Sequence, residues 1–177
     1  MNVQHIMLDL ETLGTRPGDA ILSIGAVKFA PEQGIIERFH TSIKADSCKA
    51  LGLRAQKSTL EWWNKQSEEA RAAAFAGELS IENALIKFST WLPPKDETVI
   101  WGNGANFDNA LLAAAYRAAD MDVAWHFWND RCYRTVSAMF MKTKVERVGT
   151  GHNALDDAET QALRLLKMQE ESGFALK

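Results

Sequence analysis

Two carboxylates interrupt the most hydrophobic stretch of the sequence. Asp9 and Glu11 lie at the end of the apolar segment 3–10 and directly after it. Because side chains alternate along a strand, residues two apart point to the same face, and both carboxylates would project side by side. Like charges this close disfavour joint ionisation unless a cation compensates them, and hard oxygen ligands suit Mg²⁺ or Mn²⁺. The alternative is a strand end with Glu11 in water and Asp9 capping a turn.

A third acid follows a later strand and a glycine loop. Asp108 comes after the apolar segment 98–101 and the loop 102–104. In α/β sheets ligands gather where strands end and helices begin, so Asp108 is placed as a binding residue would be. The alternative is helix capping, with Asn106 as the N-cap and Asp108 complementing the helix dipole. Phe107 beside it is expected in the core.

A histidine and two acids precede and open the last predicted helix. His152 lies in a loop, and a histidine there titrates near neutrality and suits a general base. Capping is again the alternative, because Asn153 stands three positions before Asp156. The apolar stripe of the helix flanks both Asp156 and Asp157, so it does not choose between them.

The elements that must position these residues follow strand and helix patterns in turn. Three strands at 3–10, 20–29 and 35–43, joined by short turns, predict an antiparallel meander. The later segments predict helices at 58–63, 68–76, 81–92, 106–119, 133–142 and 153–172, and short strands at 98–101 and 123–128. Ser58 and Glu61 form a capping-box pattern, and Ser80 is a further N-cap. We therefore expect one α/β domain over residues 1–177, a mixed sheet with helices packed on it.

Composition excludes several classes of protein. Apolar residues make up 46% of the 177, enough for a core, and the net charge of −3 argues against a polybasic nucleic-acid or membrane binder. Cys48 and Cys132 form no CxxC pattern, so neither a disulfide framework nor a zinc ribbon is expected. The N-terminal stretch is unlike a signal peptide and no apolar run is long enough to span a membrane. We expect a cytoplasmic protein with no membrane partner.

In order and spacing, the three motifs resemble those of the DnaQ-like DEDDh 3′→5′ exonucleases, which have an RNase H-like fold. The family's Asp-x-Glu-Thr-x-Gly motif is similar to residues 9–14, and its Asn…Phe/Tyr-Asp motif is similar to 103–108, although here Gly104 follows the Asn directly. The His-x4-Asp motif matches His152 and Asp157 and so selects Asp157 over Asp156. The resemblance covers nearly the whole chain and is nearest to a small phage and bacterial branch of DexA-type exodeoxyribonucleases and mycobacterial exoribonucleases.

This resemblance implies a five-stranded mixed sheet with flanking helices and a two-metal-ion exonuclease. Two divalent cations, Mg²⁺ or Mn²⁺, would be held by the four acids Asp9, Glu11, Asp108 and Asp157. His152 would accept a proton from the attacking water. Glu11 and the backbone of Thr12 would meet the terminal 3′-hydroxyl, and the same resemblance places Leu13, Asn103 and Phe107 in contact with substrate.

The implied partner is a single-stranded 3′ end or 3′ overhang. The resemblance to phage enzymes favours DNA by a small margin, and an exoribonuclease is the alternative. A non-catalytic nucleic-acid-binding module and a phosphodiesterase for mono- or dinucleotides are two further hypotheses. Five basic residues could follow the nucleic-acid backbone or form a solvated face: Arg131, Arg134, Lys142, Lys144 and Arg147.

Two groups of aromatic residues have more than one interpretation. Trp62 and Trp63 are neighbours on a helix, about 100° apart, so at most one is fully buried and the other is a candidate for stacking on a terminal base. Trp125, Phe127 and Trp128 are expected in the core or at a homodimer contact.

Overall fold

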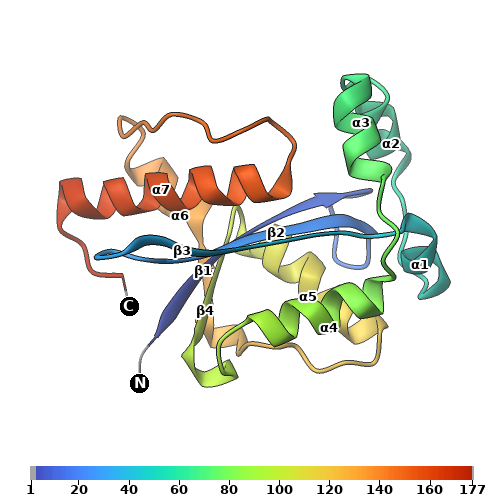
Figure 1. The fold of residues 1–177 in the computed structure, drawn as a ribbon, viewed down its shortest axis with the longest axis horizontal. Helices are drawn as coiled ribbons and strands as arrows, with labels where there is room; N and C mark the ends of the chain where they lie inside the picture. The colour runs from blue at the N-terminus through green and yellow to red at the C-terminus, as the bar shows by residue number, and fades with distance from the viewer. Residues whose placement is uncertain (1–2, 177) are drawn as a thin grey trace.

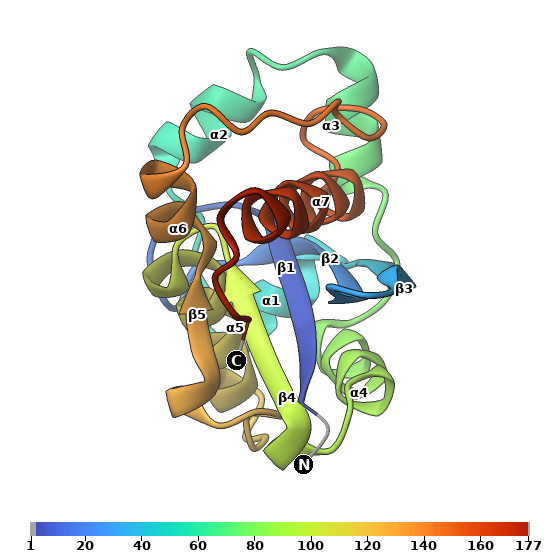
Figure 2. The same ribbon diagram turned by 90° about the vertical axis from the view of Figure 1, so that its left-hand side faces the viewer.

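A five-stranded sheet in the order β3-β2-β1-β4-β5 forms the centre of this computed structural model, which describes residues 3–176 (Figures 1 and 2). The strands are β1 (Gln4–Thr12), β2 (Ile21–Ala30), β3 (Gly34–Ser42), β4 (Thr98–Gly102) and β5 (Asp130–Cys132). β1, β2 and β3 pair antiparallel, which confirms the predicted meander. β4 pairs parallel with β1 and with β5, so the sheet is mixed.

The central strand β1 is covered on both faces, which explains its continuous apolar sequence. Ile6, Met7 and Leu8 are fully buried. Ile6 and Leu8 belong to one hydrophobic cluster and Met7 to the other, as alternation along a strand requires. Asp9 and Glu11 share the parity of Met7 and therefore point to the same face as it does. Glu11 lies inside β1 and is buried, so the alternative that placed it in water is wrong.

Seven α-helices surround the sheet in the described residues. They are α1 (Ala45–Ala50), α2 (Lys57–Trp63), α3 (Glu68–Phe75), α4 (Ile81–Trp91), α5 (Ala110–Ala118), α6 (Tyr133–Met139) and α7 (Ala154–Ser172). In Figure 1, α7 lies on one face of the sheet, α4 and α5 lie on the other, and α1, α2 and α3 gather at one end. Ala158, Ala162 and Leu165, at helical spacing on α7, pack with Met7 and Val27 in one cluster. The Met7 face of β1 is therefore the face that α7 covers.

The fifth strand and the segment that leads into it differ from the prediction. The segment 123–128 is not a strand; it leads through a short 3₁₀ turn (Phe127–Asn129) into β5. Trp125 is buried as expected, and its indole N–H donates to Asp130 Oδ1 over 2.8 Å. Phe127 and Trp128 are exposed (78% and 61%), so they are not core residues. The apolar pattern reflects one buried tryptophan in an irregular segment.

Helix boundaries were predicted better where a capping side chain was recognised correctly. Ser80 and Asn153 accept hydrogen bonds from backbone N–H groups of α4 and α7, which confirms both caps. The capping box at Ser58 is wrong, because α2 begins one residue earlier, after Gln56. The short helix α1 was not predicted, and α6 ends at Met139 rather than near residue 142.

Cys48 and Cys132 are both free thiols, in agreement with the sequence. None of the helices within residues 3–176 has the length and apolar character that crossing a bilayer requires.

Candidate active site and metal centre

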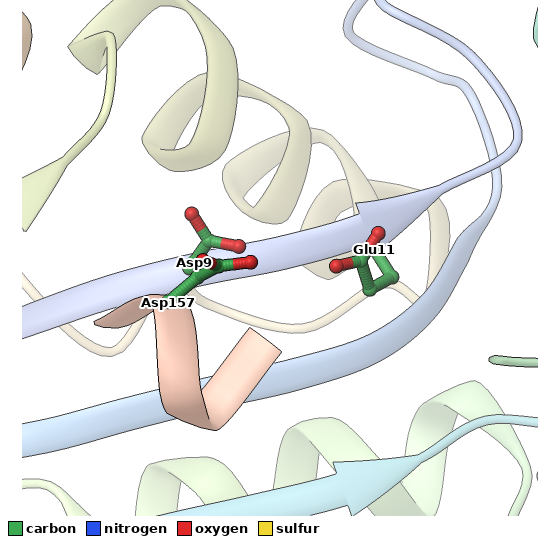
Figure 3. Close-up of side chains that lie close together, drawn as sticks. All are labelled: Asp9, Glu11 and Asp157. Atoms are coloured by element: carbon green, nitrogen blue, oxygen red, sulfur yellow. The ribbon is translucent and has the colours of Figure 1, made fainter. Parts of the chain in front are cut away.

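Three carboxylates meet beside the C-terminal half of β1. Asp9 and Glu11 project from the same face of the strand, and Asp157 reaches toward them from the first turn of α7 (Figure 3). One carboxylate oxygen from each lies within 4.8 Å of those from the other two. Oxygen atoms at this spacing can ligate one hard divalent cation together. The structure therefore joins two of the sequence motifs, more than 140 residues apart, into one cluster.

Asp108, the fourth predicted acid, lies deep beside this cluster. It belongs to a π-helical turn (Ala105–Asn109) between β4 and α5 and is only 1% exposed. Its Oδ2 has no hydrogen-bond partner among the described residues. Gly104, with φ +115°, is the N-cap of this turn, so the prediction of an Asn106 cap is wrong. A buried oxygen without a partner is costly, and a bound cation would supply the missing interaction.

The turn that carries Asp108 packs closely against the end of β4. A Cβ at Gly102 would lie 2.2 Å from Asn109 Oδ1 and 3.0 Å from Asp108 Cβ. Asn109 is held in turn, because its amide donates to the Ile100 carbonyl (3.2 Å) and to Asp130 Oδ1 (2.8 Å). Asp108 is thus fixed by the sheet rather than by helix capping.

Burial and mutual repulsion make these acids hard to ionise. Burial, followed by the charges of Asp157 and Asp108, raises the pKa of Glu11 to about 8. Burial likewise raises the pKa of Asp108 to about 7. The pKa of Asp9 lies well above its usual range, first because of burial and then because of Asp108. A divalent cation would compensate the charges and favour the ionised forms, so the donor set fits such an ion.

A glycine in β2 allows α7 to approach the sheet closely. Gly25 pairs with Asp9 across β1 and β2. A Cβ at this position would lie 2.1 Å from the carbonyl carbon of Ala154, the first residue of α7. The N-terminus of α7 rests directly on the backbone of β2 at this point, and Asp157 consequently faces Asp9. Sequence reasoning missed Gly25, since its role depends on contact with a distant helix.

Asp156 and Asp157 have different neighbours, which settles the ambiguity of the helical pattern. Asp156 Oδ2 accepts a hydrogen bond from the backbone N–H of Thr150 (2.8 Å) and so ties the preceding loop to α7. Asp157 faces the other acids. One turn later on α7, Gln161 donates to Asp9 Oδ1 over 2.7 Å. Gln161 was missed, although its spacing of four residues from Asp157 was a usable signal.

His152 lies at the exposed rim of the cluster. Its backbone has φ +62°, an uncommon conformation for a residue with a side chain. Its backbone N–H donates to Asp157 Oδ2 (3.1 Å), and its ring packs edge-to-face against Trp62 with the ring centroids 4.9 Å apart. The backbone of His152 is therefore tied to one of the acids, and the residue is exposed to solvent, as a group that exchanges protons must be.

The two neighbouring tryptophans of α2 have different environments. Trp63 is 1% exposed, and its indole N–H donates to the carbonyl of Thr12 at the end of β1 (2.9 Å). Trp62 is 39% exposed. The prediction that at most one is fully buried is confirmed. Trp63 presents almost no surface to a base and instead anchors α2 to β1.

A pocket of about 410 Å³ adjoins the acids, within the range of small-ligand sites. It brings together several predicted substrate-binding residues, and its lining is Leu10, Glu11, Thr12, Thr15, Ser58, Thr59, Trp62, Trp63 and Phe107. Phe107 packs partly against the core, as expected. Leu13 is buried in the core and outside this lining.

Two arginines act on different acids of the site. The guanidinium of Arg134, on α6, donates to the carbonyl of Asn103 over 2.5 Å, and its charge acts to lower the pKa of Asp108. Arg147, on the loop before α7, forms an ion pair with Asp157 Oδ1. Both were noted in the sequence only as part of a basic stretch, since their contacts depend on the fold.

Comparison with known proteins assigns the chain to a family. The family described as the 3′-5′ exoribonuclease Rv2179c-like domain matches residues 4–168. The chain belongs to this family. Its five-stranded sheet with flanking helices is the RNase H-like exonuclease fold that the motifs predicted.

One curated relative and two solved structures extend the comparison of this Rv2179c-like chain. The exodeoxyribonuclease of Enterobacteria phage T4 is 26% identical over 157 residues, covering 73% of this chain and 68% of the phage protein. The nuclease domain of 3′hExo, a DEDDh family member bound to rAMP, has a TM-score of 0.65 at 11% identity, covering 96% and 92% of the two chains. E. coli Exonuclease I in complex with a dA16 oligonucleotide has a TM-score of 0.66 at 19% identity, covering 96% and 41%.

Proposed function

We propose that the chain is a divalent-metal-dependent exonuclease that removes nucleotides from single-stranded or overhanging 3′ ends. The observation that carries this proposal is the cluster of Asp9, Glu11 and Asp157 oxygens within 4.8 Å of one another. The buried, unpartnered Oδ2 of Asp108 adds a fourth ligand. Family membership and the names of the relatives support hydrolysis of nucleic acid from the 3′ end.

The four acids would hold two cations, Mg²⁺ or Mn²⁺. Bound ions of this kind activate water and stabilise charge on the attacking and leaving oxygens. Burial of the acids favours this role, because a water-poor site strengthens each charge interaction. Gln161 keeps the Asp9 carboxylate oriented through its hydrogen bond to Oδ1.

His152 is the proposed general base of the reaction. Its backbone N–H donates to Asp157 Oδ2, a proposed metal ligand, and its ring packs edge-to-face with Trp62, which supports this role. An imidazole nitrogen would accept the proton of the attacking water and release it to solvent, to which His152 is exposed.

The pocket beside Glu11 is the proposed site of the terminal nucleotide. Glu11 and the backbone of Thr12 would contact the 3′-hydroxyl, and the partly exposed Trp62 offers a face on which a base can stack. Buried Trp63 lines the same pocket. A contact with the 3′-hydroxyl at this place would favour a strand terminus over a continuous strand, which supports exonucleolytic cleavage.

DNA is the preferred substrate in this proposal by a small margin, on the likeness to the phage exodeoxyribonuclease. RNA is the second candidate, because the matched family is described as an exoribonuclease domain. A purely binding module is less favoured, since buried acids with raised pKa values destabilise a fold and a binder has no need of them.

A paired digestion tests the function and the preferred sugar. DNA and RNA strands of identical sequence, labelled at the 5′ end, are incubated with the protein in Mg²⁺, in Mn²⁺ or in EDTA. We expect ladders that shorten from the 3′ end, dependence on metal and faster cleavage of DNA. Faster cleavage of RNA would assign the enzyme as an exoribonuclease. No shortening of either strand by folded protein with metal would contradict the proposal.

A further inference from the structure

The guanidinium of Arg147 occupies the position of a counter-ion at the carboxylate cluster. It pairs with Asp157 Oδ1, while Oδ2 of the same carboxylate accepts the backbone N–H of His152. Both oxygens of Asp157 are thereby engaged. A divalent cation that uses Asp157 as a ligand is therefore brought close to the positive charge of Arg147, which repels it.

The charge of Arg147 reaches beyond Asp157. It acts to lower the pKa of Glu11, against the raising effects of burial and of the neighbouring acids. One cationic side chain therefore partly compensates two acids of the same cluster. A metal ion would perform the same compensation with a higher charge, and the two cations cannot share one oxygen without repelling each other.

The backbone on both sides of Arg147 is fixed, but its side chain is half-exposed. The N–H of Val148 donates to Thr160 Oγ1 (3.0 Å), and the carbonyl of Lys144 accepts from Lys167 (2.8 Å). The side chain of Arg147 is 49% exposed. The guanidinium can therefore change position by side-chain rotation, without rearrangement of the loop.

A second position for the guanidinium is present next to the first. Arg147 also lines a cavity of about 1000 Å³ between its own loop, α7 and the turn after β2. Three acids, Glu32, Glu146 and Glu170, line the same cavity together with one lysine, Lys167, so its lining stays net negative apart from Arg147. None of the four acids of the cluster lines it. The cavity offers both space and negative charge to an arginine displaced from Asp157.

We propose that Arg147 is a resident counter-cation of the metal centre, which holds Asp157 in the metal-free protein and swings toward the cavity when a divalent ion binds. This inference rests on the proposed function, because it presumes that Asp157 is a metal ligand. Arg147 is then a positioning residue that acts through Asp157 and sets the metal concentration at which the site fills.

Calorimetric titration of Mn²⁺ into the full chain tests the proposal. Arg147→Ala removes the competing charge, and we expect Mn²⁺ to bind about 3–5-fold more tightly, the upper part of the range for a half-exposed ion pair. Arg147→Lys should restore an affinity near that of the wild type. Lys144→Ala, which removes one positive charge from the same loop, is the matched control and should change the affinity by less than about twofold.

Thermal unfolding of the same variants provides a second readout. In EDTA, Arg147→Ala should unfold at a lower temperature than the wild type, since Asp157 loses its ion-pair partner. In saturating Mn²⁺ the two should unfold alike.

Failure of this inference and failure of the proposed function give different results. If the wild type binds Mn²⁺ no better than Asp157→Ala, the metal centre itself is wrong. If binding depends on Asp157 but Arg147→Ala binds Mn²⁺ as the wild type does, or more weakly, only the role of Arg147 is overturned. An equal gain in affinity from Lys144→Ala would also overturn it, by assigning the effect to net charge.

Discussion

The two halves of the candidate site are built in different ways. Asp9, Glu11 and Asp108 project from β1 and from the turn after β4, where the sheet fixes them and burial raises their pKa values. His152 and Trp62 lie at the rim on an exposed loop and a short helix, and contact each other edge-to-face. The half on the sheet bears the electrostatic cost of gathering the acids of the proposed metal centre, and the rim bears the contacts that an incoming strand would meet.

This difference predicts that substitutions in the two halves will separate activity from stability. Neutralising a buried acid should remove activity and stabilise the metal-free fold. Truncating a rim residue should reduce activity with little change in the free energy of unfolding.

Asp9→Asn is expected to give the largest effect. The rate of 3′-end cleavage should fall by about a thousandfold or more, because a central metal ligand loses its charge. In EDTA, the free energy of unfolding at pH 8 should rise by about 1 kcal/mol, since a neutral amide replaces a carboxyl group whose ionisation the site disfavours, while Gln161 can still donate to the amide oxygen. Urea unfolding monitored by circular dichroism measures this change. A variant that is both inactive and less stable than the wild type would contradict the predicted difference between the two halves of the site.

His152→Ala should reduce the rate by about 10²- to 10⁴-fold, the usual contribution of a general base. Binding of Mn²⁺ and of a 3′-ended strand should persist. His152→Asn is the matched control for backbone strain, because Asn tolerates the left-handed conformation at this position. It should be as slow as the alanine variant. Recovery of the wild-type rate in His152→Asn would assign the residue a conformational role instead.

Trp62→Ala should act mainly on substrate binding. Loss of one stacked base is expected to raise KM by about 5- to 100-fold, with a smaller fall in kcat from the less restricted His152 ring. Steady-state kinetics on a short single strand measures both constants. Trp128→Ala, at an exposed tryptophan beside β5, is the control and should leave KM unchanged. A large fall in kcat at unchanged KM would place Trp62 with His152 rather than with the substrate.

The smallest expected effect is the pH dependence of stability without metal. The pKa values of Glu11 and Asp108 in the fold, about 8 and about 7, lie above the ordinary values of 4.5 and 3.8. Their protonation therefore contributes stability that is complete below about pH 4 and is lost as the pH rises through 7 and 8. Between pH 5 and pH 9 in EDTA, the free energy of unfolding should fall, because the fold holds protons at these two carboxyl groups that the unfolded chain has already released. Saturating Mg²⁺ should reduce this fall. An equal fall with and without Mg²⁺ would contradict the proposal that these acids bind a divalent cation.

The parts of the site that sequence could predict are those whose signal is local. Asp9 and Glu11 are two residues apart in an apolar strand, and strand geometry alone places them together. Asp157 was selected by resemblance, and its neighbour Asp156 proved to bind the loop instead. Gly25 gave no usable local signal, because it acts through a segment far away in the chain. Arg147 lies only ten residues before its partner Asp157, but nothing in an irregular loop indicates which way its side chain points.

Prediction of the fold was likewise accurate only where the sequence carries a local signal. The meander and the mixed sheet followed from apolar runs and their order. The short strand β5 was misplaced, since only three residues pair there and the stronger apolar pattern precedes them. The π-helical turn that buries Asp108 has no periodicity to read, and its position depends on Gly102 and Asn109 packing against each other.

The most direct test of the account compares two adjacent acids of α7. Asp157→Ala and Asp156→Ala have the same charge and differ by one position, but only Asp157 faces Asp9 and Glu11. Each is incubated in Mg²⁺ with a 5′-labelled single strand. We predict that Asp156→Ala shortens the strand from its 3′ end at a rate near that of the wild type, and that Asp157→Ala, although folded, does not. Cleavage by Asp157→Ala at the wild-type rate would contradict the assignment of this cluster as the catalytic centre.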